Sequence, residues 1–166
     1  AKIEKVKLLS INDQRRLHIG IAANLSGYTS INDNELKTVA ANVEKNLRER
    51  GYATTMLDFN NVSQTFEDLH YTDIDLVFNI SEGSNNGSRL KPQAAGILET
   101  LHIPYTGTDS LNLALCGKKI RVKKFLAYHN IPTPKWDYAY SLNDKISGEL
   151  KYPLIVKPSN TDNSIG

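Results

Sequence analysis

The sequence predicts an α/β fold with a parallel sheet, because short apolar runs alternate with segments of helical periodicity. Residues 17–24 form a near-continuous apolar run, which is typical of a strand covered on both faces. Residues 52–59 and 74–80 are interpreted as the second and third strands. A helical segment between consecutive strands indicates right-handed crossovers and therefore parallel pairing. Because ligands of such sheets bind at the carboxyl ends of the strands, the loops after Asn24 and Ile80 are expected to be functional.

The clearest helix is predicted between the first two strands. Asn32 and Glu35 have the spacing of a capping box, and Gly51 stands where a C-terminal cap is expected. Apolar residues recur at helical spacing between these signals. They are Leu36, Val39, Ala40, Val43 and Leu47.

The remaining elements are shorter. In chain order they are a helix within 60–70, a helix over 93–101, a strand and turn at 103–107, and helices over 108–115 and 117–129. Trp136–Tyr140 and Tyr152–Lys157 are expected to pair as antiparallel strands. We interpret residues 1–16 as a leader or linker, 17–107 as the first domain, and 108–166 as the first part of a second, truncated domain.

The composition indicates an ordinary globular protein. Hydrophobic residues make up 40% of the chain and charged residues 23%, and the net charge of +2 is too small to indicate nucleic-acid binding. The basic residues of 117–129 spread around the predicted helix instead of forming the single-faced stripe that nucleic acid requires. No apolar run reaches membrane-spanning length, so no membrane partner is expected. The single cysteine, Cys116, fits a reducing compartment, and we expect a cytoplasmic location.

Two stretches carry candidate binding residues. An apolar run leads to Lys157, and Pro158 and a series of small polar residues follow it. Small polar residues favour turns with exposed N–H groups, which can cradle a phosphate, and Lys157 would add a positive charge. The alternative is a solvated lysine at a strand end. In the loop after Ile80, Glu82 and Arg89 could hold the amine and carboxylate of an amino acid, or form a solvated pair.

Five motifs together resemble one enzyme family. They are 78–83 (FNISEG), 98–107 (LETLHIPYTG), 113–119 (LALCGKK), 131–134 (IPTP) and 155–158 (IVKP). In this order they are similar to the D-alanine–D-alanine ligases and related carboxylate–amine ligases of the ATP-grasp superfamily. The resemblance implies a Rossmann-like pre-ATP-grasp domain with a parallel sheet, followed by the beginning of the ATP-grasp central lobe.

The resemblance also implies roles for individual residues. Lys119 and Lys157 match the two lysines that contact ATP phosphates. Residues 159–166, with Ser159, Asn163 and Ser164, match the loop that folds over those phosphates, although Asp162 replaces a family glycine. Three residues are expected to bind substrate, on different grounds. Glu35 lies near the family's substrate-binding glutamate, Glu82 takes the place of a histidine in the better-known ligases, and Arg89 is a candidate for the carboxylate.

The implied reaction joins an amino-acid carboxylate to an amine through an acyl phosphate, using ATP and Mg²⁺. The acidic magnesium ligands of the family lie in its C-terminal lobe and are expected beyond Gly166, so we expect residues 1–166 alone to be inactive. The expected partners are small amino-acid substrates and, in a homodimer, a second copy. Two alternatives stay open, namely a non-catalytic nucleotide- or amino-acid-binding module and a dimerisation domain.

Overall fold

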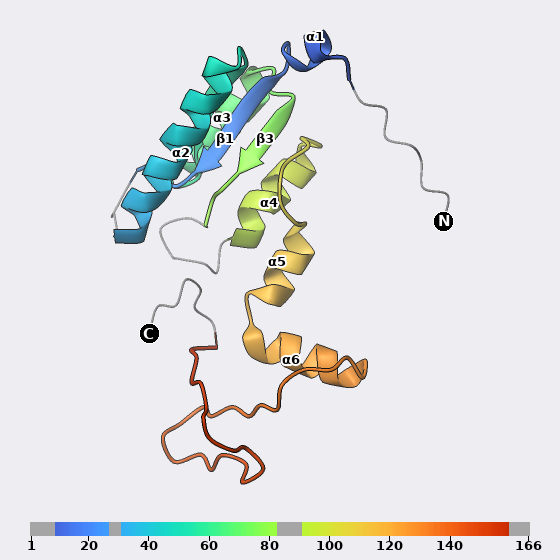
Figure 1. Ribbon diagram of the computed structural model, residues 1–166. Helices are drawn as coiled ribbons and strands as arrows, with labels where there is room; N and C mark the ends of the chain where they lie inside the picture. Colours follow the sequence, from blue (N-terminus) through green and yellow to red (C-terminus); the bar gives the residue numbers. More distant parts are fainter. Residues whose placement is uncertain (1–8, 27–30, 83–90, 160–166) are drawn as a thin grey trace. The chain divides into compact units, whose positions relative to one another are not determined.

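The computed structural model describes residues 9–26, 31–82 and 91–159 (Figure 1). The chain divides into two compact units, residues 1–110 and residues 111–166, which are described separately. The first helix in the described part of this unit is short, α1 (Ile11–Gln14), and its N-cap Ser10 accepts a hydrogen bond from the backbone N–H of Asp13. None of the helices in the described segments combines the length and hydropathy of a membrane span.

The predicted α/β fold with a parallel sheet is confirmed in the first unit. Strands β1 (His18–Ala23), β2 (Ala53–Asp58) and β3 (Leu76–Asn79) are all parallel, in the order β2-β1-β3. Ile21 is paired with Met56 on one side and with Phe78 on the other. A single parallel bridge joins Val77 to Tyr105, where the sequence predicts a further short strand.

Helices cover both faces of the sheet (Figure 1). Helix α2 (Ile31–Glu49) packs on one face, where the buried residues are Ile21, Ala23 and Ala40. Helices α3 (Val62–Tyr71) and α4 (Lys91–Thr100) pack on the other face. Its buried residues are Ala22, Leu57, Phe59, Leu69, Val77, Ala94 and Leu98. Gly20 faces this second cluster, where an added Cβ would lie 2.9 Å from Cδ1 of Leu57, so the close packing requires glycine.

The two ends of α2 differ in how well the sequence predicts them. The helix begins at Ile31, so Asn32 and Glu35 both lie inside it and the predicted capping box at its start is wrong. The predicted C-terminal cap is confirmed, because Gly51 has a φ of +88° and donates its N–H to the carbonyl of Arg48. The left-handed φ after a helix favours glycine, so this signal marks a single position in the sequence. The residue types of a capping box can instead be matched at several neighbouring positions, so this signal locates the helix start less well.

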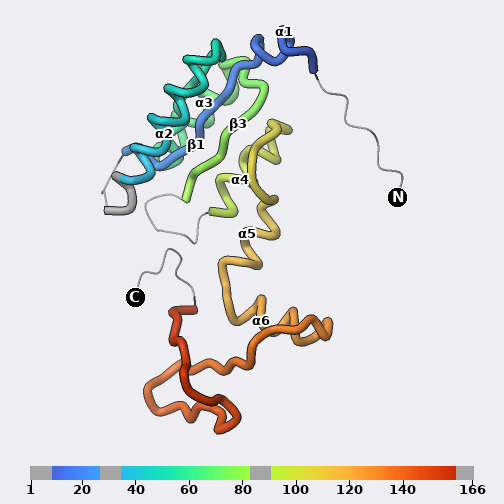
Figure 2. The backbone as a smooth tube through the Cα atoms, viewed as in Figure 1, coloured from blue at the N-terminus to red at the C-terminus, as the bar shows by residue number. Residues whose placement is uncertain are grey.

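The second unit contains α5 (Ser110–Cys116), which starts at the last residue of the first unit, and α6 (Lys119–Tyr128). Within the described part of 111–166 there is no β-strand, so the predicted antiparallel pairing of 136–140 with 152–157 is wrong (Figure 1). The backbone of these two segments can be followed in Figure 2. Ile155 and Val156 are 82% and 94% exposed. An isolated two-stranded hairpin is marginal unless further strands or a helix cover its apolar face, and no such cover is present over these two side chains.

Candidate functional site

Polar side chains gather at the carboxyl end of the parallel sheet. Asn24 follows β1, Asp58 ends β2, and Glu82 follows β3. Asn24 is only 3% exposed. Its Nδ2 donates to Oδ1 of Asn60 (2.7 Å), and its Oδ1 accepts the backbone N–H of Glu82 (2.8 Å). One buried amide therefore links the loops that follow all three strands and fixes the main chain at Glu82.

Asp58 organises the same region through its carboxylate. Its Oδ1 accepts the backbone N–H groups of Leu25 (2.8 Å) and Asn60 (3.0 Å). Burial alone would raise the pKa of Asp58, but hydrogen bonds from the Ser26 side chain and from the backbone of Leu25, Asn60 and Ser26 together lower it. The fold therefore favours the ionised carboxylate.

This shift predicts a loss of stability in acid. Because the pKa of Asp58 is lower in the folded state, its contribution is present above the ordinary aspartate value of 3.8 and is lost as the pH falls through the folded value. We expect the free energy of unfolding to fall below about pH 4, and to fall less steeply in Asp58→Asn. Urea unfolding between about pH 3 and 6, followed by circular dichroism, measures both slopes. The exposed Asp73→Asn variant is the control, and equal slopes for Asp58→Asn and the parent chain would contradict the assignment.

Glu82 forms an ion pair that the sequence analysis missed. Nζ of Lys91 lies 3.6 Å from Oε1 of Glu82, and the two side chains are 21% and 33% exposed. Lys91 is the first residue of α4, which the sequence predicts to start two residues later. The spacing of Glu82 and Lys91 along the chain does not predict this ion pair, because the two residues are brought together by the fold and not by the local sequence.

In the second unit, the start of α6 lies beside the segment that follows Lys157. The backbone N–H of Lys119 donates to the carbonyl of Ser159 (3.2 Å). Since consecutive residues span at most about 3.6 Å, the Cα atom of Lys157 lies within about 7 Å of that of Ser159. Lys119 and Ser159 are partly buried and Lys157 is exposed. The N-cap of α6, Lys118, makes no side-chain hydrogen bond to the helix, so its side chain satisfies none of the first N–H groups.

The other predicted site residues are not part of these two clusters. Glu35 is an exposed residue of α2. Arg89, Asn163 and Ser164 lie outside the described residues. Among residues 9–26, 31–82 and 91–159, no group of three or more histidine, cysteine, aspartate or glutamate side chains could hold a metal ion.

Glu99, Tyr105 and Ser110, which lie in or near the family motifs, form a separate hydrogen-bonded group. The Glu99 carboxylate accepts the hydroxyls of Tyr105 (2.6 Å) and Ser110 (2.6 Å) and the backbone N–H of Ser110 (2.8 Å). The bonds from Ser110 and Tyr105 lower the pKa of Glu99, while burial and then the bond to Glu99 raise the pKa of Tyr105 to about 12. This group ties the first residue of α5 to α4, which is a structural role.

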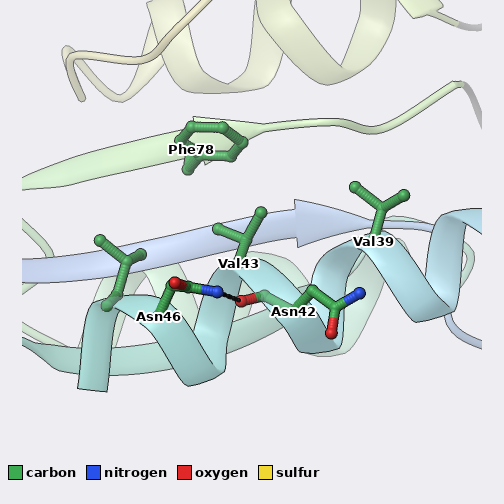
Figure 3. A pocket seen from close by; sticks show the side chains of 6 residues that line it. Val39, Asn42, Val43, Asn46 and Phe78 are labelled. Carbon is green, nitrogen blue, oxygen red and sulfur yellow. Dashed lines mark hydrogen bonds between the residues drawn. The ribbon is translucent and has the colours of Figure 1, made fainter. Parts of the chain in front are cut away.

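A groove of about 350 Å³ lies elsewhere in the first unit, between α2 and β3 (Figure 3). In Figure 3, Val39 and Val43 of α2 and Phe78 of β3 line it, and Nδ2 of Asn46 donates to the carbonyl of Asn42 (2.8 Å). Its lining includes none of the predicted site residues. Its apolar character also differs from the charged sites that an amino acid or ATP requires.

The chain is similar to ligases of known sequence and structure. A D-alanine–D-alanine ligase of Syntrophotalea carbinolica is 32% identical over 149 residues, which are 88% of this chain and 46% of that protein. One from Pseudomonas putida is 40% identical over 102 residues, 59% of this chain and 30% of that protein. No protein-family model matches the chain.

The chain is also similar to solved structures of D-alanine–D-alanine ligases. A crystal structure of the D-alanine–D-alanine ligase of Bacillus anthracis matches with a TM-score of 0.68 and 26% identity, over 90% of this chain and 48% of that one. The same enzyme complexed with ATP matches with a TM-score of 0.65 and 27% identity, over 87% of this chain and 48% of that one. The chain thus spans less than half of the length of each matched protein in these four comparisons.

Proposed function

The chain resembles the N-terminal part of the D-alanine–D-alanine ligases, and from this premise we propose that it carries one side of an ATP site. In this proposal the parent protein joins an amino-acid carboxylate to an amine through an acyl phosphate and releases ADP. Lys119, Lys157 and Ser159 contact the triphosphate. The observation that supports the proposal is the hydrogen bond from the backbone N–H of Lys119 to the carbonyl of Ser159, because it joins two segments that are far apart in the sequence and are each predicted to bind phosphate.

The chemistry of the second unit fits a polyphosphate. The helix dipole favours an anion near the start of α6, where the backbone N–H of Lys119 donates to Ser159 and those of Arg121 and Val122 donate to Lys118. Two lysine side chains then supply the charge that phosphoryl transfer needs, since such reactions depend mainly on positioning and charge neutralisation. When Mg²⁺ is bound with ATP it neutralises further charge, and the proposal assigns it no ligand among the described residues.

Titration of the 166-residue chain with ATP tests this assignment. We expect Lys119→Ala and Lys157→Ala each to weaken ATP binding about tenfold or more, because a charge-assisted hydrogen bond contributes about 1.5–3 kcal/mol. Isothermal calorimetry gives the dissociation constants. Lys145→Ala, which removes another exposed lysine of the same unit, is the matched control and should bind ATP unchanged. Equal affinities for all four proteins would contradict the proposal.

The same samples distinguish the alternatives. A dimerisation domain would not bind ATP, and a binding module would bind it without turnover. ADP release that depends on an added amino acid would identify a catalyst. We expect no amino-acid-dependent ADP release from residues 1–166 alone, since the chain spans about half the length of the ligases that it matches.

A further inference from the structure

We propose that Lys123 is a positioning residue for the phosphate-binding lysine at the start of α6. Its ammonium ties the middle of α6 to residues 131–134 and thereby holds Lys119 in place, while Lys123 itself contacts no phosphate. This role rests on the proposed function, because it concerns the same ATP site. Lys119, Lys123 and residues 131–134 all belong to the unit formed by residues 111–166.

Helix α6 is not anchored by a buried core. None of the residues described between 111 and 159 is buried, whereas the first unit contains two buried clusters. Phe125 and Tyr128, two large apolar residues of α6, are 47% and 82% exposed. Tertiary packing of an apolar face is what usually stabilises a helix in a protein. The position of α6 within its unit therefore depends to a greater extent on polar contacts.

Lys123 makes polar contacts to the segment that follows the helix. Its Nζ donates to Oγ1 of Thr133 (2.5 Å) and to the carbonyl of Pro134 (3.1 Å). Because the donor is charged, each of these bonds is stronger than a bond between neutral groups. Lys123 and Thr133 are both partly buried, and a hydrogen bond gains strength where water is partly excluded. One side chain thus fixes two residues of 131–134 to the middle of α6.

Lys119 and Lys123 lie on the same side of α6. They are four positions apart, which places their side chains one turn apart on one face of the helix. In the first turn, the backbone N–H of Lys119 donates to the carbonyl of Ser159 (3.2 Å). The contacts of the two lysines therefore hold the helix at positions one turn apart. Since a preorganised group binds more tightly than a mobile one, release of Lys123 should weaken phosphate binding by Lys119.

The hydrogen bonds of Lys123 distinguish this role from that of a phosphate ligand. A lysine ammonium has three N–H donors, and Lys123 donates to Thr133 and Pro134. Removing the Thr133 hydroxyl takes away an acceptor of Lys123 but no positive charge. Thr133→Val should therefore weaken ATP binding when Lys123 acts by positioning, whereas it should leave ATP binding unchanged when Lys123 binds phosphate directly.

ATP titrations of the 166-residue chain by isothermal calorimetry test the proposal. We expect Lys123→Met to weaken ATP binding about three- to tenfold and Thr133→Val about two- to fivefold, because residues in contact couple to this extent. The double variant should bind no more weakly than Lys123→Met, since both changes break the same contact. Lys123→Arg keeps the charge and the donors and should retain most of the affinity. Lys145→Met removes an exposed lysine of the same unit and should bind ATP like the parent chain.

A second measurement reports on α6 without ATP. The amide resonance of Lys119 should shift in Lys123→Met and in Thr133→Val but not in Lys145→Met, and circular dichroism verifies that each variant is folded. Unchanged ATP affinity in Thr133→Val, or an unshifted Lys119 resonance in both variants, would overturn the proposal. If Lys123→Met does not fold, Thr133→Val provides both measurements. A parent chain that binds no ATP contradicts the proposed function, whereas equal ATP binding by the parent and these variants overturns only the role of Lys123.

Discussion

Leu98→Ala is expected to lower the free energy of unfolding of the first unit by about 2–5 kcal/mol. Leu98 is fully buried in α4 and belongs to the cluster that also contains Leu57 and Val77. Truncation removes apolar surface from the core and leaves a cavity, because strands on one side and a helix on the other limit how far the neighbours can collapse. The effect is therefore large for a single substitution.

The measurement has to report on the first unit. The single tryptophan, Trp136, lies in the second unit, so urea unfolding is best followed by circular dichroism together with hydrogen exchange of the β1 amides. Leu111→Ala is the control, since Leu111 is 77% exposed and should change stability by less than about 0.5 kcal/mol. If Leu98→Ala does not fold, Leu98→Val leaves a smaller cavity and should show an intermediate loss. A loss in Leu98→Ala no greater than that in Leu111→Ala would refute the assigned core.

Asn24→Ala is expected to cost about 2–4 kcal/mol, because each buried polar group left without a partner costs about 1–3 kcal/mol. The side-chain amide of Asn24 accepts the backbone N–H of Glu82 and donates to the side-chain oxygen of Asn60, and Asn24 is 3% exposed. Removing it frees two loops at the carboxyl end of the sheet at once. We therefore expect the loss of stability to be accompanied by faster exchange of the Glu82 amide hydrogen.

Asn42→Ala is the matched control for this change. Asn42 is an exposed asparagine of α2, where truncation should be nearly neutral. Hydrogen exchange followed by NMR resolves the Glu82 amide in both variants. Unchanged protection of that amide in Asn24→Ala would show that the hydrogen bond does not hold the loop.

Much of the fold was determined by the sequence alone. The apolar run of β1 is buried from Ile19 to Ala23, and a strand covered in this way requires the near-continuous hydrophobic pattern from which β1 was predicted. The C-terminal cap at Gly51 was predicted for a comparable reason, since its left-handed φ is a local property of one residue. The family resemblance was likewise carried by short motifs whose order the sequence displays.

Only the tertiary structure decided which polar groups meet. Asn24 and Glu82 are 58 positions apart along the chain, and their contact follows from β1 and β3 being neighbours in the sheet. Lys91 reaches Glu82 because α4 starts beside the end of β3. The strand pairing predicted for 152–157 was wrong because it also depended on tertiary contacts. Residues with high β-propensity form a stable pair of strands only where neighbouring elements cover their apolar face. Local patterns thus determined the helices and the buried strands, whereas contacts between distant loops depend on how those elements pack, which no short stretch of residues encodes.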